Sequence, residues 1–131
     1  MIKNYDFDLL ICLLNKEESN LLDAEDFHDL SVLRNKIQTQ PISDEEIKYL
    51  IKKHWKLSFE IVSNKNIKIE NVLSILLFVN NFQREYSFFL CKKVMQRNDS
   101  KEIARALFNM ESFLKPDFQN IFAEKIELNT G

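Results

Sequence analysis

The chain has 131 residues, of which 45% are hydrophobic and 29% are charged, as expected of a globular protein rather than a disordered one. It has one glycine, two histidines and two cysteines, too few to build glycine-rich phosphate loops, dinucleotide-binding fingerprints, metal cages or nucleophile–base pairs in their usual forms. The formal net charge of −2 gives no sign of binding to nucleic acid or to a membrane surface, and the length predicts a single domain over residues 1–131.

Two helices are predicted in the first third of the chain. The first covers about residues 4–15, where apolar side chains recur at helical spacing. The second covers about residues 21–38, with Asn20 as its N-terminal cap. Its periodicity predicts that four side chains face the core: Phe27, Leu30, Leu33 and Ile37.

The third predicted helix has the clearest start in the chain. Ser43 is followed three residues later by Glu46, a capping-box sequence, and Pro41 ends the preceding helix. We expect this helix to run to about residue 62. His54 lies on its apolar stripe, so the histidine is expected to be buried and satisfied by a hydrogen bond.

The fourth predicted helix is the longest and covers about residues 69–96. Its first half, around residues 72–79, is apolar on nearly every face and is predicted to be the central spine of the domain. The apolar stripe then continues through five further side chains: Phe82, Tyr86, Phe89, Leu90 and Val94.

Two more helices are predicted toward the end of the chain. Asp99 followed by Glu102 marks the start of a helix that continues to about residue 114 with Ile103, Leu107, Met110 and Leu114 in its stripe. Pro116 is well placed in the first turn of a sixth helix, with Phe118, Ile121 and Phe122 facing the core.

These patterns predict an all-α fold, because no segment alternates convincingly at period two. About six helices with short connections predict an irregular bundle or stacked helical hairpins, with the helix over residues 69–96 at the centre. Cys12 and Cys91 each lie in an apolar run and are expected to be reduced, buried thiols. The N-terminus does not resemble a secretory signal, and no apolar run approaches the roughly 20 residues of a membrane span, so we expect a cytoplasmic protein.

The charges are unevenly distributed along the chain. Residues 1–46 hold eleven acids and four bases, a net of −7, whereas the remaining 85 residues have a net charge of +5. Residues 17–29 contain six acids and no lysine or arginine, and we predict that these acids form a docking surface for a basic partner: Glu17, Glu18, Asp23, Glu25, Asp26 and Asp29. A solvated helix face is the simpler interpretation of the same run.

A second group of charges is basic and lies in the third predicted helix: Lys48, Lys52, Lys53 and Lys56. Lys48, Lys52 and Lys56 are one helical turn apart and lie near Trp55, so they could contact phosphates while the ring stacks on a base. The slightly acidic balance of the whole chain argues against nucleic-acid binding.

Catalysis and metal binding are not expected. Glu25 and His28 have the Glu-x-x-His spacing of helical di-metal sites, but that spacing occurs once and no second histidine or cysteine accompanies it. The sequence therefore predicts no enzyme activity, no metal and no other cofactor.

In its size, its helicity, its lack of catalytic residues and its acidic segment 17–29, the chain resembles the small helical immunity proteins of bacterial contact-dependent and other polymorphic toxin systems. The resemblance extends over the whole chain and rests on no motif. Such proteins are compact and cytoplasmic, and each neutralises a cognate toxin, frequently a nuclease, by covering its active site.

The resemblance implies a non-catalytic toxin inhibitor that docks an acidic surface on a basic active-site region, with exposed aromatic side chains as anchors. Two alternatives stay open. One is a small helical regulator that binds nucleic acid through the lysines listed above, and the other is an adaptor that self-associates.

Overall fold

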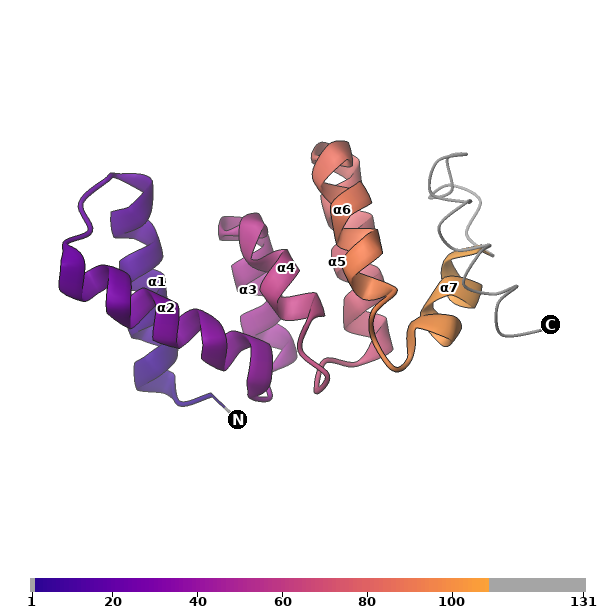
Figure 1. Cartoon of the computed structure of the whole chain (residues 1–131), viewed down its shortest axis with the longest axis horizontal. Helices are drawn as coiled ribbons and strands as arrows, with labels where there is room; N and C mark the ends of the chain where they lie inside the picture. Colours follow the sequence, from indigo (N-terminus) through magenta and orange to yellow (C-terminus); the bar gives the residue numbers. More distant parts are fainter. Residues whose placement is uncertain (1, 109–131) are drawn as a thin grey trace. The chain divides into compact units, whose positions relative to one another are not determined.

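The computed structural model describes residues 2–108, apart from the side chains of Phe82 and Phe108, and all regular elements of this part are helical (Figure 1). The predicted all-α class is therefore confirmed for residues 2–108. The chain divides into two compact units, residues 1–66 and residues 67–131. The elements are α1 (Asn4–Glu18), α2 (Ala24–Thr39), α3 (Asp44–Lys53), the 3₁₀ turn η1 (Trp55–Leu57), α4 (Ser58–Val62), α5 (Ile69–Phe82), α6 (Arg84–Val94) and α7 (Ser100–Phe108).

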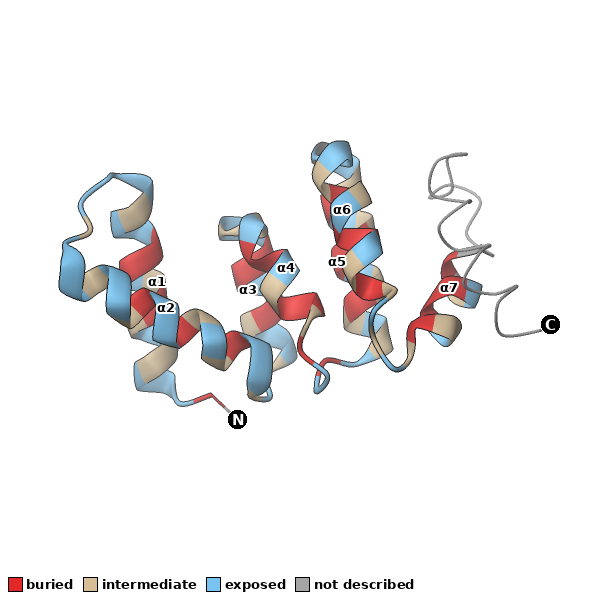
Figure 2. Ribbon diagram, in the orientation of Figure 1, coloured by how far each residue is buried: buried red, intermediate tan, exposed pale blue. Residues whose placement is uncertain are grey.

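In the first unit, α2 is the middle element, because it packs against both α1 and α4. The buried side chains lie on the facing sides of these helices (Figure 2) and include Leu10, Leu14, Leu30, Leu33, Ile37, Leu50, Ile61 and Val62. Two ion pairs show that α1 and α2 are antiparallel: Asp6 near the start of α1 meets Lys36 near the end of α2 at 2.8 Å, and Lys16 meets Asp26 at 3.5 Å.

In the second unit, α5 and α6 lie side by side and α7 packs against α5 (Figure 1). Each helix contributes one buried stripe: Val72, Ile75, Leu76 and Val79 from α5, Ser87, Leu90, Cys91 and Val94 from α6, and Ile103, Ala104 and Leu107 from α7. Burial of these stripes against one another is the main stabilising contribution in this unit.

The predicted helix over residues 69–96 is wrong as a single element. It is two helices, broken at Gln83, whose backbone has φ −138° and ψ 73°. Gln83 donates its N–H to the carbonyl of Val79 and accepts from the N–H of Ser87, so it ends one helix and begins the next. The break lets α6 fold back on α5, so the apolar stripes of the two helices bury each other. In a straight helix the two stripes would lie at different points along the axis and could not pack together.

The predicted helix over residues 43–62 is also broken. The capping box of Ser43 and Glu46 is present as predicted, and α3 follows it. However, α3 ends at Lys53, His54 adopts φ −137° and ψ 59°, and the chain continues through η1 into α4. With this change of direction, Leu50 before the break and Leu57 after it are both buried.

Four apolar residues differ from their predicted burial or from their place in an apolar stripe. Phe27 and Phe89 are exposed, Phe78 is partly exposed, and Cys12 is exposed although Cys91 is buried. The reason is helical phase. In α1 the buried stripe is Leu10, Leu13 and Leu14, and in α6 it passes through Ser87, Leu90 and Cys91, which turns Cys12 and Phe89 outward.

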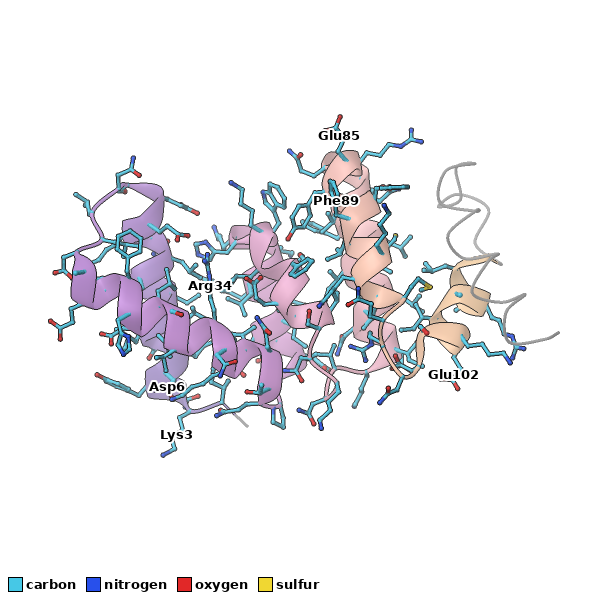
Figure 3. The ribbon with its side chains drawn as sticks, viewed as in Figure 1. Lys3, Asp6, Arg34, Glu85, Phe89 and Glu102 are labelled. Atoms are coloured by element: carbon cyan, nitrogen blue, oxygen red, sulfur yellow. The ribbon has the colours of Figure 1, made fainter. Side chains whose placement is uncertain are left out.

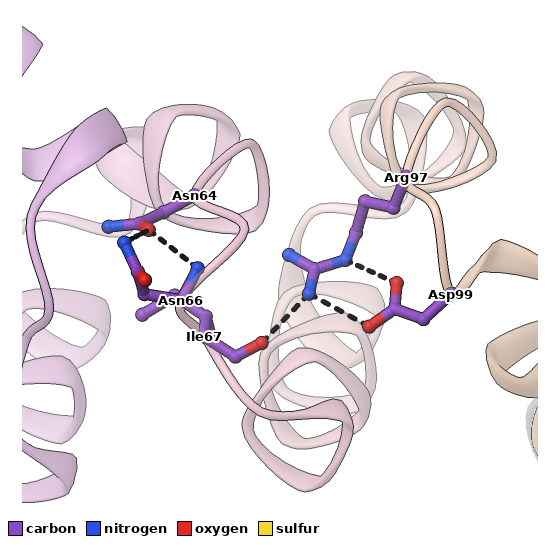
Figure 4. Close-up of polar contacts among 5 residues, drawn as sticks. All are labelled: Asn64, Asn66, Ile67, Arg97 and Asp99. Carbon is purple, nitrogen blue, oxygen red and sulfur yellow. Dashed lines mark hydrogen bonds and ion pairs between the residues drawn. The ribbon is translucent and has the colours of Figure 1, made fainter.

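Asn64, just after α4, forms hydrogen bonds with the end of α2. Its side chain is fully buried, and its Nδ2 donates to the carbonyls of Ile37 at 2.8 Å and Gln40 at 2.6 Å. Its Oδ1 accepts from the N–H of Asn66 at 2.9 Å (Figure 4). Every polar atom of this buried amide is therefore satisfied, as burial requires.

Arg97 plays the corresponding role in the second unit. Its side chain is only 7% exposed, and it binds Asp99 through two nitrogens, Nε at 2.8 Å and Nη2 at 3.0 Å. Nη2 also donates to the carbonyl of Ile67 at 2.8 Å (Figure 4). The α6–α7 connection is thereby tied to the segment that leads into α5.

Two predicted features lie outside the described residues: the end of the 99–114 helix with Met110 and Leu114, and the sixth helix from Pro116 with Phe118, Ile121 and Phe122. The choice between a bundle and stacked hairpins remains a prediction. None of the helices within residues 2–108 has the length and apolar character needed to cross a membrane.

Candidate protein-binding surface

The acidic segment surrounds the turn between α1 and α2. α1 ends in a Schellman arrangement, in which the N–H of Leu21 donates to the carbonyl of Lys16 at 2.9 Å and the N–H of Asn20 to that of Glu17 at 3.1 Å. Asn20 has φ 57°, the left-handed conformation that usually calls for glycine. In a chain that has one glycine, asparagine fills this position.

The start of α2 lies three residues after the predicted cap. Asp23, not Asn20, is the N-cap: its carboxylate accepts the N–H of Asp26 at 2.8 Å, and the Asp26 carboxylate accepts the N–H of Asp23 at 3.3 Å. Two of the six predicted docking acids therefore also hold the first turn of α2. Asn20 was predicted as a cap because it can begin a helix, but here it ends one.

Two more of the acids contact bases within the first unit. Glu17 Oε1 binds Arg34 Nη2 at 3.1 Å, and Glu18 Oε1 lies 3.2 Å from His54 Nδ1. The His54 side chain is 7% exposed, so its predicted burial is confirmed, whereas the predicted hydrogen bond of the imidazole stays a prediction. Glu18 itself keeps most of its side chain in solvent.

The last two acids, Glu25 and Asp29, form no hydrogen bond or ion pair through their carboxylates within residues 2–108. They lie one helical turn apart on α2, so their charges reinforce each other at the surface. These two carboxylates are the ones available to a partner without loss of an internal contact.

Two large apolar side chains are exposed among the acids. Leu21 is 69% exposed in the turn and Phe27 is 59% exposed in the first turns of α2. We name the group formed by Glu18, Leu21, Asp23, Glu25 and Phe27 the acidic corner. Its members lie within ten residues of sequence and are all exposed.

A cavity of about 540 Å³ adjoins the acidic corner at Glu18. Its lining includes the carboxylates of Glu17 and Glu18, the bases Arg34, Lys53 and Lys56, and His54. Glu17 is paired with Arg34 and Glu18 lies 3.2 Å from His54, so both carboxylates already have partners within the first unit.

A second cavity, of about 490 Å³, lies between α2 and α4 and is lined by Phe27 together with Glu17, Arg34 and Glu60. Arg34 projects from α2 into this region (Figure 3). Burial raises the pKa of the Glu60 carboxyl and the charge of Glu17 adds to this, whereas its own backbone N–H and Arg34 act in the opposite direction. Glu60 Oε2 is buried and accepts no hydrogen bond within residues 2–108.

The four lysines of the alternative site are exposed, but the prediction that Lys48, Lys52 and Lys56 share one helix face is wrong. Lys48, Lys52 and Lys53 lie on α3, whereas Lys56 lies in η1, because α3 ends at Lys53. Lys56 Nζ lies 5.8 Å from the centre of the Trp55 ring, a cation–π contact.

Lys53 and Lys56 line the same cavity as Glu17 and Glu18. These carboxylates would repel a phosphate backbone that approached the two lysines. The surroundings of half of the lysine group are therefore unfavourable for nucleic acid.

The thiol of Cys91 is not activated. Burial raises the pKa of Cys91 to about 12, and the nearby Ser87 hydroxyl lowers it by less, so this residue is a neutral thiol at pH 7. Cys12 lies on the exposed side of α1. Within residues 2–108 no group of three or more histidine, cysteine, aspartate or glutamate side chains is arranged to hold a metal ion, and this includes the Glu25 and His28 pair.

Two residues of this region were not singled out from the sequence. The sequence predicts Glu60 inside one long helix. Its contacts depend on the break at His54, which no local signal in the sequence marks. Leu21 was assigned to the second helix, whereas it follows the left-handed Asn20. An Asn–hydrophobic pair directly after an amphipathic run is the signal that could have located the turn.

The chain was compared with family models, with curated proteins and with solved structures, and none of them matches it. The chemistry of the acidic corner and its neighbouring cavity is therefore the basis for a functional proposal.

Proposed function

We propose that this chain is a non-catalytic immunity protein that acts in the cytoplasm and neutralises a cognate toxin, in the first instance a nuclease. It does so by docking the acidic corner on the basic region around the toxin's active site. The observation that carries the proposal is the exposure of Leu21 and Phe27 among carboxylates. Exposed apolar side chains within a charged rim are typical of protein-binding surfaces.

The two kinds of side chain have different tasks in such a complex. Burial of Leu21 and Phe27 stabilises the bound state at roughly 25 cal/mol for each Å² of apolar surface removed from water. The carboxylates of Glu25 and Asp29 attract a basic surface from a distance, which accelerates association. A nuclease must present positive charge to hold its substrate, so its cleft has the matching sign.

The experiment pairs this chain with the C-terminal toxin domain encoded next to its own gene. Co-expression with that domain is expected to restore bacterial growth, and the purified proteins are expected to form a complex. Growth arrest that persists although both proteins are folded and soluble would contradict the proposal.

The docking surface is tested by reversing Glu25 of the acidic corner together with the half-exposed Asp29 one helical turn further along α2, with Glu25→Lys and Asp29→Lys combined; neither carboxylate has an internal partner among the described residues. We expect the association rate constant to fall about tenfold at low salt while the dissociation rate constant changes by less than about twofold. The matched control, Glu70→Lys with Glu85→Lys, makes the same change in net charge on exposed acids of the second unit and should leave both rates nearly unchanged. Equal effects of the two pairs would mean that only net charge matters and that the acidic corner is not the docking surface.

A further inference from the structure

We infer that the cavity between α2 and α4 receives one arginine side chain of the partner protein, with Glu60 as its hydrogen-bond acceptor. The identity of the partner rests on the proposed function; the chemistry of the cavity does not. This contact completes the docking surface, next to the Glu25 and Asp29 carboxylates that attract the partner.

The cavity is continuous with the acidic corner, because Phe27 belongs to both. Its volume of about 490 Å³ falls in the range of pockets that hold a small ligand or a single side chain. All of its lining residues come from α1, α2 and α4, so the cavity is complete within the first unit.

The charges of the lining side chains favour a cation. Glu17 and Glu60 carry negative charge and Arg34 carries positive charge, which leaves one negative charge unbalanced. Glu17 is already bound to Arg34 at 3.1 Å, so Glu60 is the carboxylate that still lacks a counter-charge in contact. Arg34 Nε is also buried without an acceptor among the described residues, but the net charge of the lining is negative and favours a cationic group over an anionic one.

One oxygen of the Glu60 carboxylate also lacks a donor. Its Oε2 is buried without a hydrogen-bond partner among the described residues, and a buried carboxylate oxygen in that state is costly. The raised pKa of Glu60 has the same origin, since burial disfavours its charged form. A cationic donor placed beside Glu60 would satisfy the oxygen and reverse part of that penalty.

Arginine fits this cavity better than lysine. Its planar guanidinium can donate to Glu60 while its face stacks on the exposed ring of Phe27. Lysine offers a compact ammonium that makes no such stacking contact and holds its water more strongly. Ser31 and Asn35, which also line the cavity, offer oxygens to the remaining N–H groups.

The experiment is an NMR titration of the full chain with Nα-acetyl-arginine methylamide, which carries the side chain without a terminal charge. The neutral isostere Nα-acetyl-citrulline methylamide serves as the matched ligand. We expect saturable shifts at the Glu60 carboxyl carbon and the Phe27 ring with a Kd on the order of millimolar, as befits a single side chain. The citrulline compound is expected to bind at least fivefold more weakly.

Two variants and one control test the named residues. Glu60→Gln removes the charge at nearly constant shape and should weaken binding at least fivefold, and Phe27→Leu should weaken it about two- to threefold. Glu70→Gln makes the same chemical change on an exposed residue of the second unit and should bind as the unmodified chain does. Shifts that do not saturate, equal binding of the citrulline compound, or unchanged binding by a folded Glu60→Gln chain would overturn the inference.

This titration needs no toxin, so its failure is separate from failure of the proposed function. If the toxin complex forms and the arginine titration is negative, the immunity function stands and the arginine site is withdrawn. If both hold, Glu60→Gln should raise the dissociation rate constant of the toxin complex at least fivefold, in contrast to the charge reversals at Glu25 and Asp29, which act on association.

Discussion

At the scale of single residues, Asn20 shows how a chain with almost no glycine makes its turns. It adopts φ 57° directly after α1, and the N–H groups of Asn20 and Leu21 satisfy two of the last carbonyls of the helix. Asparagine tolerates this conformation better than other residues with a side chain but less well than glycine. The lack of glycine therefore does not mean that the chain avoids left-handed backbone.

Substitutions at Asn20 should reveal this conformational cost. We expect Asn20→Gly to raise the free energy of unfolding by up to about 1 kcal/mol, because glycine adopts positive φ without a steric penalty. Asn20→Ala should lower it by about 1 kcal/mol, since alanine has neither that freedom nor a side-chain amide. Urea denaturation of the three chains provides the measurement, and an Asn20→Ala chain as stable as the original would contradict the assigned turn.

At the scale of elements, the sequence predicts where helices start better than where they break. The capping box at Ser43 involves residues three apart and is therefore visible in the sequence, and it is confirmed. The breaks at His54 and Gln83 have nearly the same backbone angles, and neither residue is glycine or proline. Each break is set by packing on distant parts of the chain, which local periodicity does not contain.

The break at Gln83 also explains why the predicted position of Phe89 in the apolar stripe was wrong. Once α6 folds back on α5, the phase of its stripe is set by Ser87, Leu90 and Cys91, and Phe89 turns outward. A continuous helix would have kept Phe89 close to the stripe that begins in α5. The pattern of apolar residues thus predicted the correct core for most of each helix but not the rotation of the second half.

The link between α6 and α7 gives a prediction that depends on pH. The hydrogen bonds from Arg97 hold the pKa of Asp99 below its ordinary value, so this carboxylate stabilises the folded state above its unfolded-state pKa and loses that effect as the pH falls through its folded-state pKa. We expect Asp99→Asn to cost about 1–3 kcal/mol at pH 7, because it leaves the buried guanidinium of Arg97 without its counter-charge.

The difference between the two chains should shrink as the pH falls below about 4, because the aspartate of the unfolded state becomes protonated there before the aspartate of the folded state. Urea denaturation at a series of pH values from 7 down to 3 measures this directly. Glu102→Gln, an exposed acid on α7, is the control and should change stability far less at every pH. A cost of Asp99→Asn that is constant with pH would show that the ion pair does not stabilise the fold.

At the scale of the whole molecule, the uneven charge is the property that the sequence predicted most directly. Residues 1–46 carry a net charge of −7, and the structure places six of these acids around one turn and the helix that follows. What the sequence could not predict is how those acids are used. Asp23 and Asp26 cap α2 through a local contact, whereas Glu17 binds Arg34 on another helix, a contact that local sequence does not reveal.

The immunity function and the nucleic-acid-binding function can be distinguished by how strongly the chain binds RNA and how that affinity responds to salt. Contact of four lysines with a single strand predicts that affinity falls about 50-fold when salt rises fourfold. We expect instead that a labelled 20-nucleotide RNA binds this chain with a Kd above about 100 µM even at 50 mM KCl, because Glu17 and Glu18 lie beside Lys53 and Lys56. Fluorescence anisotropy at 50 and 200 mM KCl measures this.

The same titration with glutamine at Lys48, Lys52, Lys53 and Lys56 identifies the contact. Tight binding that is steeply salt-dependent and lost with these four substitutions would establish the lysine face as the functional surface, and the acidic corner would then be an ordinary solvated helix end. Weak binding that the substitutions leave unchanged, together with sedimentation as a monomer, would exclude both the nucleic-acid regulator and the self-associating adaptor. Recognition of the chain by a basic protein partner would then be the remaining function.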